Sequence, residues 1–241
     1  MPGLGFYGKL PAHGDFVRRG MSPALATAWD GWLSALMAAV RDDLGEEAWL
    51  DAYLTGPVWR FALGHGVAGV AQTGVMVPSV DRVGRYFPLV LTAPLDGPRR
   101  LATALRHGRS LLDQLEDLAC RALDSDSLDA DDLMSDLEAL DWGWPDTADD
   151  PAGAGESSRP GVWVPLGNAE ACETITGLAW LMTDAGGPLE DSMGGLWWTD
   201  GSEQVGGGIL RTRGWPPVPQ AVAFLDGAWA ARGWTGWSRA A

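Results

Sequence analysis

Four short runs of strand-forming residues follow one another closely in the first half of the chain. They are Val58–Leu63, Val67–Gln72, Gly74–Val77 and Tyr86–Ala93, with glycine and proline between them. Parallel strands need a long crossover, so this spacing favours antiparallel strands joined by short connections. Proline cannot donate a ladder hydrogen bond, so Pro88 predicts that the last strand lies at an edge or begins late.

Helical patterns surround these strands. Ser22-Pro23 has the form of an N-cap followed by proline, and apolar residues then recur at helical spacing to about Arg41. Further helices are expected at Glu46–Leu54, Leu101–Leu123, Asp129–Leu140, Asn168–Thr183 and Gln220–Ala231, and further strands at Val162–Leu166, Leu196–Thr199 and Gly208–Thr212. The order of elements predicts an α+β fold, a mostly antiparallel β-sheet flanked by α-helices. We expect one domain over residues 1–241, with a mobile loop at 141–161, which is rich in Pro, Gly, Asp and Ser.

Composition excludes several classes of protein. No apolar run approaches the ~20 residues that span a bilayer, and the N-terminus has no signal-peptide pattern. We therefore expect a cytoplasmic protein without membrane insertion. Cys120 and Cys172 are far apart, which argues against a disulfide framework or a zinc site and favours two buried free thiols.

The net charge of −15 is unevenly spread. Residues 1–110 contain 11 Lys/Arg and 9 Asp/Glu, whereas residues 111–241 contain 6 and 23. Such a chain repels nucleic-acid phosphate, so we expect no nucleic-acid partner. The acidic half suits a basic protein partner or serves solubility alone. Its stretch Asp124–Asp132 lacks the central glycine of an EF-hand, so we expect no metal there.

The segment GLGFYGKL near the N-terminus has the glycine and lysine spacing of a phosphate-binding loop. Leu10 stands where that loop carries a serine or threonine, and leucine cannot coordinate magnesium. Only Met1 and Pro2 precede Gly3, so no strand leads into the loop. We therefore reject a nucleotide site and expect no cofactor.

Two other constellations leave alternatives open. Ser79, Asp81 and His13 are the ingredients of a hydrolytic triad, although no nucleophile-elbow motif surrounds Ser79. The fourteen tryptophans form either core and interface or a ligand-stacking surface. Trp197 and Trp198 would point to opposite faces of a strand, so at least one of them is expected inside.

The segment Pro78–Pro88 is the densest cluster of charged and conformationally restricted residues. Asp81 either pairs with Arg82, Arg85 or Arg18 to staple the N-terminal segment onto the sheet, or it belongs to a docking surface. The composition does not favour one of these interpretations over the other.

Together, GFYGKLPAHGDFVRRG (5–20) and PSVDRVGRYFPL (78–89) resemble the TagF family, also called ImpM, which is associated with bacterial type VI secretion. WDGWL (29–33), PVWRF (57–61) and SMGGLWWTDG (192–201) fit the same pattern. His13 departs mildly from it. The resemblance implies a cytoplasmic accessory protein that restrains secretion after translation by binding the system's forkhead-associated-domain scaffold protein. Some relatives carry a fused phosphatase domain; we expect a stand-alone regulator without catalytic residues.

The resemblance and the charged segments together give a set of candidate partner-binding residues. They are Lys9, Asp15, Arg18, Asp81, Arg82 and Arg85. Charge reversal at Arg82 and Arg85 is expected to weaken partner binding without unfolding the chain. The rival hypotheses are a hydrolase that uses Ser79, Asp81 and His13, and a small-ligand sensor with a tryptophan-lined pocket.

Overall fold

The fold is described from a computed structural model, which covers residues 4–95, 104, 108–140, 162–165 and 194–236. Its strands are β1 (Gly5–Gly8), β2 (Val17–Arg19), β3 (Trp59–Leu63), β4 (Gln72–Val77), β5 (Leu89–Pro94), β6 (Val162–Pro165), β7 (Gly194–Gly201), β8 (Gly206–Arg213) and β9 (Thr235–Gly236). Its helices are α1 (Pro23–Leu44), α2 (Glu46–Leu54), α3 (His65–Ala68), α5 (Arg109–Leu123), α6 (Ala130–Glu138), α8 (Val218–Ala221) and α9 (Ala223–Asp226).

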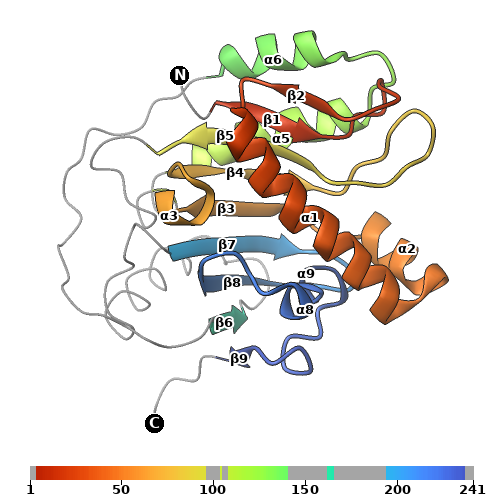
Figure 1. Cartoon of the computed structure of the whole chain (residues 1–241), viewed down its shortest axis with the longest axis vertical. Helices are drawn as coiled ribbons and strands as arrows, with labels where there is room; N and C mark the ends of the chain where they lie inside the picture. Colours follow the sequence, from red (N-terminus) through yellow and green to blue (C-terminus); the bar gives the residue numbers. More distant parts are fainter. Residues whose placement is uncertain (1–3, 96–103, 105–107, 141–161, 166–193, 237–241) are drawn as a thin grey trace, which may run out of the picture.

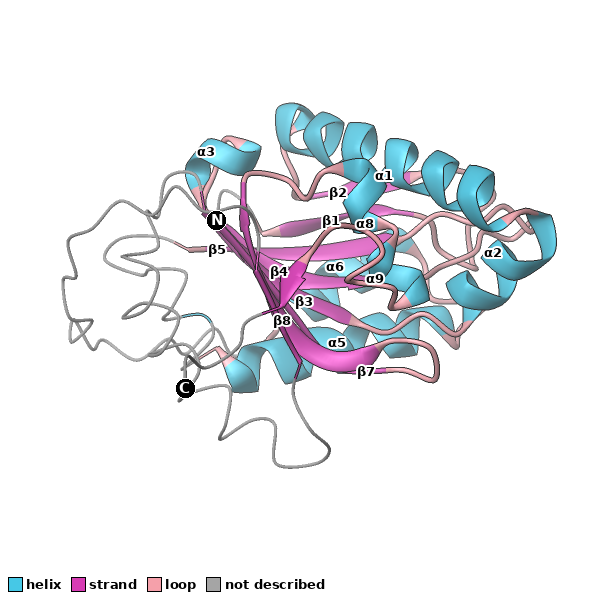
Figure 2. Ribbon diagram, turned by 90° about the horizontal axis from the view of Figure 1, so that it is seen from below, coloured by secondary structure: helices cyan, strands magenta, loops and turns pink. Residues whose placement is uncertain are grey.

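Across the described residues the strands form one nine-stranded sheet in the order β2-β1-β5-β4-β3-β7-β8-β6-β9. Every pairing is antiparallel except that of β6 with β9. Helices α1, α2, α8 and α9 cover one face of the sheet, and α5 and α6 cover the other (Figures 1 and 2). The α+β prediction, with a mostly antiparallel sheet flanked by helices, is confirmed.

Side-chain alternation along the strands divides the interior into two cores. Trp197 packs with α1 and Trp198 with the α5 side, and both are buried. The expectation that this pair points to opposite faces is therefore confirmed. Leu196, two residues before Trp198, packs on the same side as Trp198, because alternate side chains of a strand lie on the same face.

Helix α1 follows its sequence signals closely. The Ser22 side chain accepts a hydrogen bond from the Leu25 N–H at 3.2 Å, and Pro23 begins the helix. Its buried residues recur every three or four positions, so one stripe faces the sheet. Helix α2 and the Asp129-capped helix α6 also begin where the sequence predicts them.

Aromatic rings fill the core between α1 and the sheet. Trp29, Trp32, Trp197 and Trp215 pack on one another, with ring centroids 4.8–6.2 Å apart. The indole N–H of Trp32 donates to the Pro216 carbonyl at 2.9 Å, so a buried ring keeps its polar atom paired. These tryptophans form core, as one of the two sequence interpretations proposed.

Two predicted elements differ from the structure. Only Gln72 of the predicted strand Val67–Gln72 lies in β4, because α3 forms the turn that lets Leu63 pair with Gln72. The predicted helix Gln220–Ala231 is two short helices, α8 and α9. Residues 221–225 are all buried, and α9 ends at Gly227, whose φ of 65° is left-handed.

Smaller differences concern strand ends and a cysteine. Strand β5 begins after Pro88, as predicted, although it lies inside the sheet. Cys120 is exposed on α5, so its predicted burial is wrong: Leu118 and Ala119 face the core and turn Cys120 outward. The predicted loop 141–161, the predicted helix Asn168–Thr183, the start of the helix predicted from Leu101, and Cys172 lie outside the described residues.

Gly8 explains the glycine that gave the N-terminal segment its resemblance to a phosphate loop. Its φ is 140°, and a Cβ placed there would lie 2.1 Å from the Pro88 carbonyl oxygen. Strand β1 thus meets the start of β5 at a distance that only glycine allows.

Replacing Gly8 with alanine should lower the free energy of unfolding by about 2 kcal/mol or more, because the methyl group would push β1 away from Pro88. Urea unfolding measures this. Gly31→Ala is the control: Gly31 lies exposed in α1 with open space around it, and alanine there should stabilise the chain by about 1 kcal/mol. Equal effects of the two substitutions would contradict the close approach.

Candidate functional site

Two loops that are far apart in the sequence meet at one end of the sheet. Residues 9–16 join β1 to β2, and residues 78–88 join β4 to β5. Because β1 pairs antiparallel with β5, the end of β1 lies beside the start of β5 (Figure 1). The Arg82 N–H donates to the His13 carbonyl at 2.8 Å and joins the loops directly. We call the surface formed by residues 9–16 and 78–88 the two-loop face.

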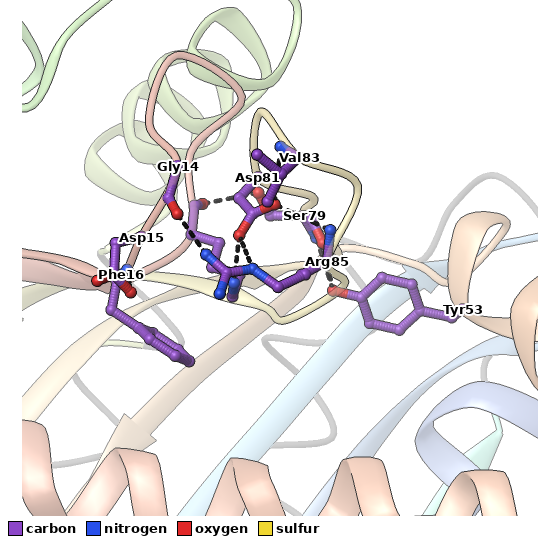
Figure 3. A network of polar contacts seen from close by, with 9 residues as sticks. Gly14, Asp15, Phe16, Tyr53, Ser79, Asp81, Val83 and Arg85 are labelled. Carbon is purple, nitrogen blue, oxygen red and sulfur yellow. Dashed lines mark hydrogen bonds and ion pairs between the residues drawn. The ribbon is translucent and has the colours of Figure 1, made fainter.

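Behind this face lies a buried ion pair between Lys9 and Asp81. Their side chains are 4% and 0% exposed. Asp81 Oδ2 accepts hydrogen bonds from Lys9 Nζ and from Arg85 Nε, the latter at 2.7 Å. Its Oδ1 accepts from the backbone N–H groups of Val83 at 3.0 Å and Arg85 at 2.9 Å (Figure 3). Four donors therefore satisfy one buried carboxylate, as a buried charge requires.

These contacts decide the protonation state of Asp81. Burial alone would raise the pKa of its carboxyl group, but the hydrogen bonds from Lys9, Arg85 and Val83 outweigh burial and hold the pKa well below its usual range. Asp81 is therefore ionised at neutral pH. Asp81 thus joins the N-terminal segment to the sheet, as the stapling interpretation proposed, but the ion pair that does so is with Lys9 and not with Arg82 or Arg18, and Arg85 adds a pair within the same loop.

Ser79 and Tyr53 tie the second loop to its surroundings. The Ser79 hydroxyl donates to the Lys9 carbonyl at 2.7 Å. The Tyr53 hydroxyl, on α2, accepts from the Ser79 N–H and donates to the Ser79 carbonyl, both at 2.8 Å. Burial raises the pKa of Tyr53, so the hydroxyl stays neutral. Both ends of the Ser79 backbone and its side chain are thus occupied.

The three residues of the proposed hydrolytic triad do not act on one another. Ser79 bonds to the Lys9 carbonyl, and Asp81 bonds to Lys9 and Arg85. His13 Nε2 accepts from the Ala130 N–H at 3.0 Å, at the start of α6. A triad needs a nucleophile–base hydrogen bond and a base–carboxylate hydrogen bond, and this structure forms neither. The burial of Lys9 against Asp81 also removes its side chain from any phosphate site, in line with the rejected nucleotide site.

The other candidate contact residues lie on the surface. The side chains of Asp15, Arg18, Arg82 and Arg85 are exposed. The Arg18 guanidinium donates to the Met21 carbonyl at 2.8 Å. Arg85 is anchored on Asp81 and also donates to the Gly14 carbonyl. Among the described residues, the Arg82 guanidinium has no hydrogen-bond or ion-pair partner.

Phe16 and Tyr53 support the two-loop face, and the sequence analysis did not identify either residue. The Phe16 ring stacks on Tyr7, with centroids 5.7 Å apart, and meets Phe87 edge-on at 4.8 Å. Lys9 Nζ lies 4.7 Å from the Phe16 ring centroid, a cation–π contact that helps to cover the ion pair. Tyr53 lies in the helical stripe of α2, where a tyrosine is typical of core. No pattern in the neighbouring sequence distinguishes these two residues from aromatic residues that only fill the core.

Asp81→Asn should lower the free energy of unfolding by about 3–5 kcal/mol, because it leaves the Lys9 ammonium buried without its counter-charge. Urea unfolding at neutral pH measures the loss. The control is Asp131→Asn, which removes a pair with Arg19 whose side chains are 43% and 79% exposed, and should change stability by less than about 1 kcal/mol. Similar losses of stability for both variants would contradict the larger contribution expected of the buried pair.

The stability difference between the native chain and Asp81→Asn should depend on pH. A carboxyl group with a depressed pKa in the folded state stabilises the fold fully above its unfolded pKa of about 3.9, and that contribution is lost as pH falls toward the folded pKa. The difference should therefore be constant above about pH 5 and shrink progressively below about pH 4. Urea unfolding of both proteins at pH values above about 5 and at several values below about 4 tests this; a stability difference of constant size over that range would contradict the assignment.

Among the described residues, none of the helices has the length and apolar character needed to cross a membrane.

Comparison with known proteins places these features in a family. The family model of the TagF N-terminal domain, described as type VI secretion system-associated, matches residues 5–140 and so includes both loops of the two-loop face. The crystal structure of PA0076 from Pseudomonas aeruginosa PAO1 is similar, with 34% sequence identity, a TM-score of 0.68, and coverage of 93% of this chain and 94% of that chain. No curated protein matches the chain. The family match spans more than half of the sequence, and the chain belongs to the TagF family of type VI secretion system-associated proteins.

Proposed function

We propose that this chain is a cytoplasmic accessory protein that restrains type VI secretion after translation by binding the forkhead-associated-domain scaffold protein of the system. Membership of the TagF family supports the association with type VI secretion. The mode of action, the partner and the absence of catalysis are our proposal, drawn from the resemblance of the two loop segments to that family.

One observation carries the proposal: the two segments that resemble the family most closely converge on a single exposed face. Residues 5–20 and 78–89 are separated by more than fifty residues, yet the Lys9–Asp81 pair and the Arg82–His13 bond hold their loops together. Arg82 and Arg85, in the second of these loops, are exposed. A fixed face with exposed charges is suited to recognising another protein.

Rigidity of this face favours binding. Loops that must order when they bind lose affinity to the entropy of ordering. Here the carboxylate of Asp81 fixes the turn at Val83 and Arg85, and the Tyr53 hydroxyl fixes Ser79. The face is therefore organised before the partner arrives.

Isothermal titration calorimetry of the full chain with the cognate forkhead-associated scaffold protein tests the proposal. We expect saturable binding that weakens between about 0.1 M and about 1 M salt, because the Debye length falls from about 10 Å to about 3 Å. A basic protein of similar size serves as the control for non-specific attraction to the acidic chain. Absence of binding to the scaffold, or binding equal to that of the control protein, would overturn the proposed mechanism.

A further inference from the structure

The two-loop face carries two of the three large apolar side chains that are exposed among the described residues. Phe16 is 43% exposed and Val83 is 64% exposed; the third, Leu54, is 58% exposed and follows Tyr53, whose hydroxyl bonds to the same face. Phe16 is partly held by its stacking on Tyr7 and its edge-on contact with Phe87. The backbone N–H of Val83 is fixed on Asp81, and most of its side chain is exposed.

The exposed charges of this face differ in sign from the net charge of the chain. Residues 9–16 and 78–88 contain three basic residues (Lys9, Arg82 and Arg85) and two acidic ones (Asp15 and Asp81). The entire chain has a net charge of −15. Lys9 and Asp81 are buried and neutralise each other, so the exposed charges of the face are those of Arg82, Arg85 and Asp15.

The two arginines of the second loop differ in how many of their side-chain donors are already bonded. Arg85 already pairs with Asp81 and donates to the Gly14 carbonyl. The backbone of Arg82 is anchored on His13, but its guanidinium has no partner in the described part of the chain. Arg82 thus presents five unused N–H donors from a fixed base, next to the exposed Val83.

We propose, on the basis of the function proposed above, that the surface of the partner that covers the two-loop face is acidic, with a carboxylate that pairs with Arg82 beside an apolar patch that covers Val83. Arg85 and Lys9 are positioning residues, which act through Asp81. A protein carboxylate suits this face better than a nucleic acid, because the strong negative charge of the chain repels an extended polyanion.

Three variants of the full chain test the inference by calorimetry against the scaffold protein. Arg82→Glu should weaken binding about tenfold or more at low salt and flatten its salt dependence, because an attraction becomes a repulsion. Val83→Ser should weaken binding severalfold and leave the salt dependence unchanged. Arg213→Glu is the matched control. Arg213 is exposed at the end of β8 and pairs with Gly194, at the end of the strands opposite the two loops. The same charge change there should alter affinity by less than about twofold.

Thermal unfolding of each variant separates binding from folding. Arg82→Glu should unfold at the temperature of the native chain, since its guanidinium has no partner to lose. Arg85→Glu should lower that temperature, because it places a carboxylate beside Asp81. A set of Asp→Lys and Glu→Lys substitutions in the scaffold should include one that restores binding of Arg82→Glu and weakens binding of the native chain.

The outcomes separate this inference from the proposed function. If the native chain binds the scaffold but Arg82→Glu binds equally well with the same salt dependence, the inference is wrong and the proposed function stands. Competition by single-stranded nucleic acid would also overturn the inference, since it would identify phosphate rather than carboxylate as the ligand. If the native chain does not bind the scaffold at all, the proposed function fails and the inference fails with it.

Discussion

The carboxylate of Asp81 is the interaction on which the described surface depends. It accepts four hydrogen bonds in a place without solvent, and two of the donors are cations from different parts of the chain. If Lys9 were lost, the buried Asp81 carboxylate would keep only the half-exposed Arg85 as a counter-charge, and if Asp81 were lost, the Lys9 ammonium would be buried without one. The energetic asymmetry between a complete and an incomplete network fixes the two loops in a single arrangement.

Local signals predicted much of this architecture because they act within a few residues. The Ser22 cap with Pro23, the acidic start of α6 and the short strand runs all depend on neighbours in the sequence. The sequence left open whether Asp81 is a staple or part of a docking surface, and it offered three arginines as its partners. It did not pair Asp81 with Lys9, because the approach of Lys9 depends on the pairing of β1 with β5, which no local pattern specifies. The same holds for His13, whose partner Ala130 lies more than a hundred residues away.

The aromatic core and the ion-pair network stabilise the fold in different ways. Rings between α1 and the sheet, such as Trp29 and Trp197, supply a large apolar area and non-directional attraction. The hydrogen bonds to Asp81 are directional, so they specify how the two loops are oriented. The interior can therefore hold the sheet and helices together while the network sets the shape of one end. The tryptophan core and the Lys9–Asp81 pair are thus different parts of the structure.

The separation of 72 residues between Lys9 and Asp81 has a consequence for biosynthesis. The N-terminal segment leaves the ribosome first, but its lysine has no counter-charge until the β4–β5 connection has been made. Strand β1 likewise has no central neighbour until β5 emerges. A growing chain therefore displays no complete face during the first third of its synthesis. Under the proposed function, a partner that recognises this face would bind only copies of the chain in which β1 has been inserted into the sheet.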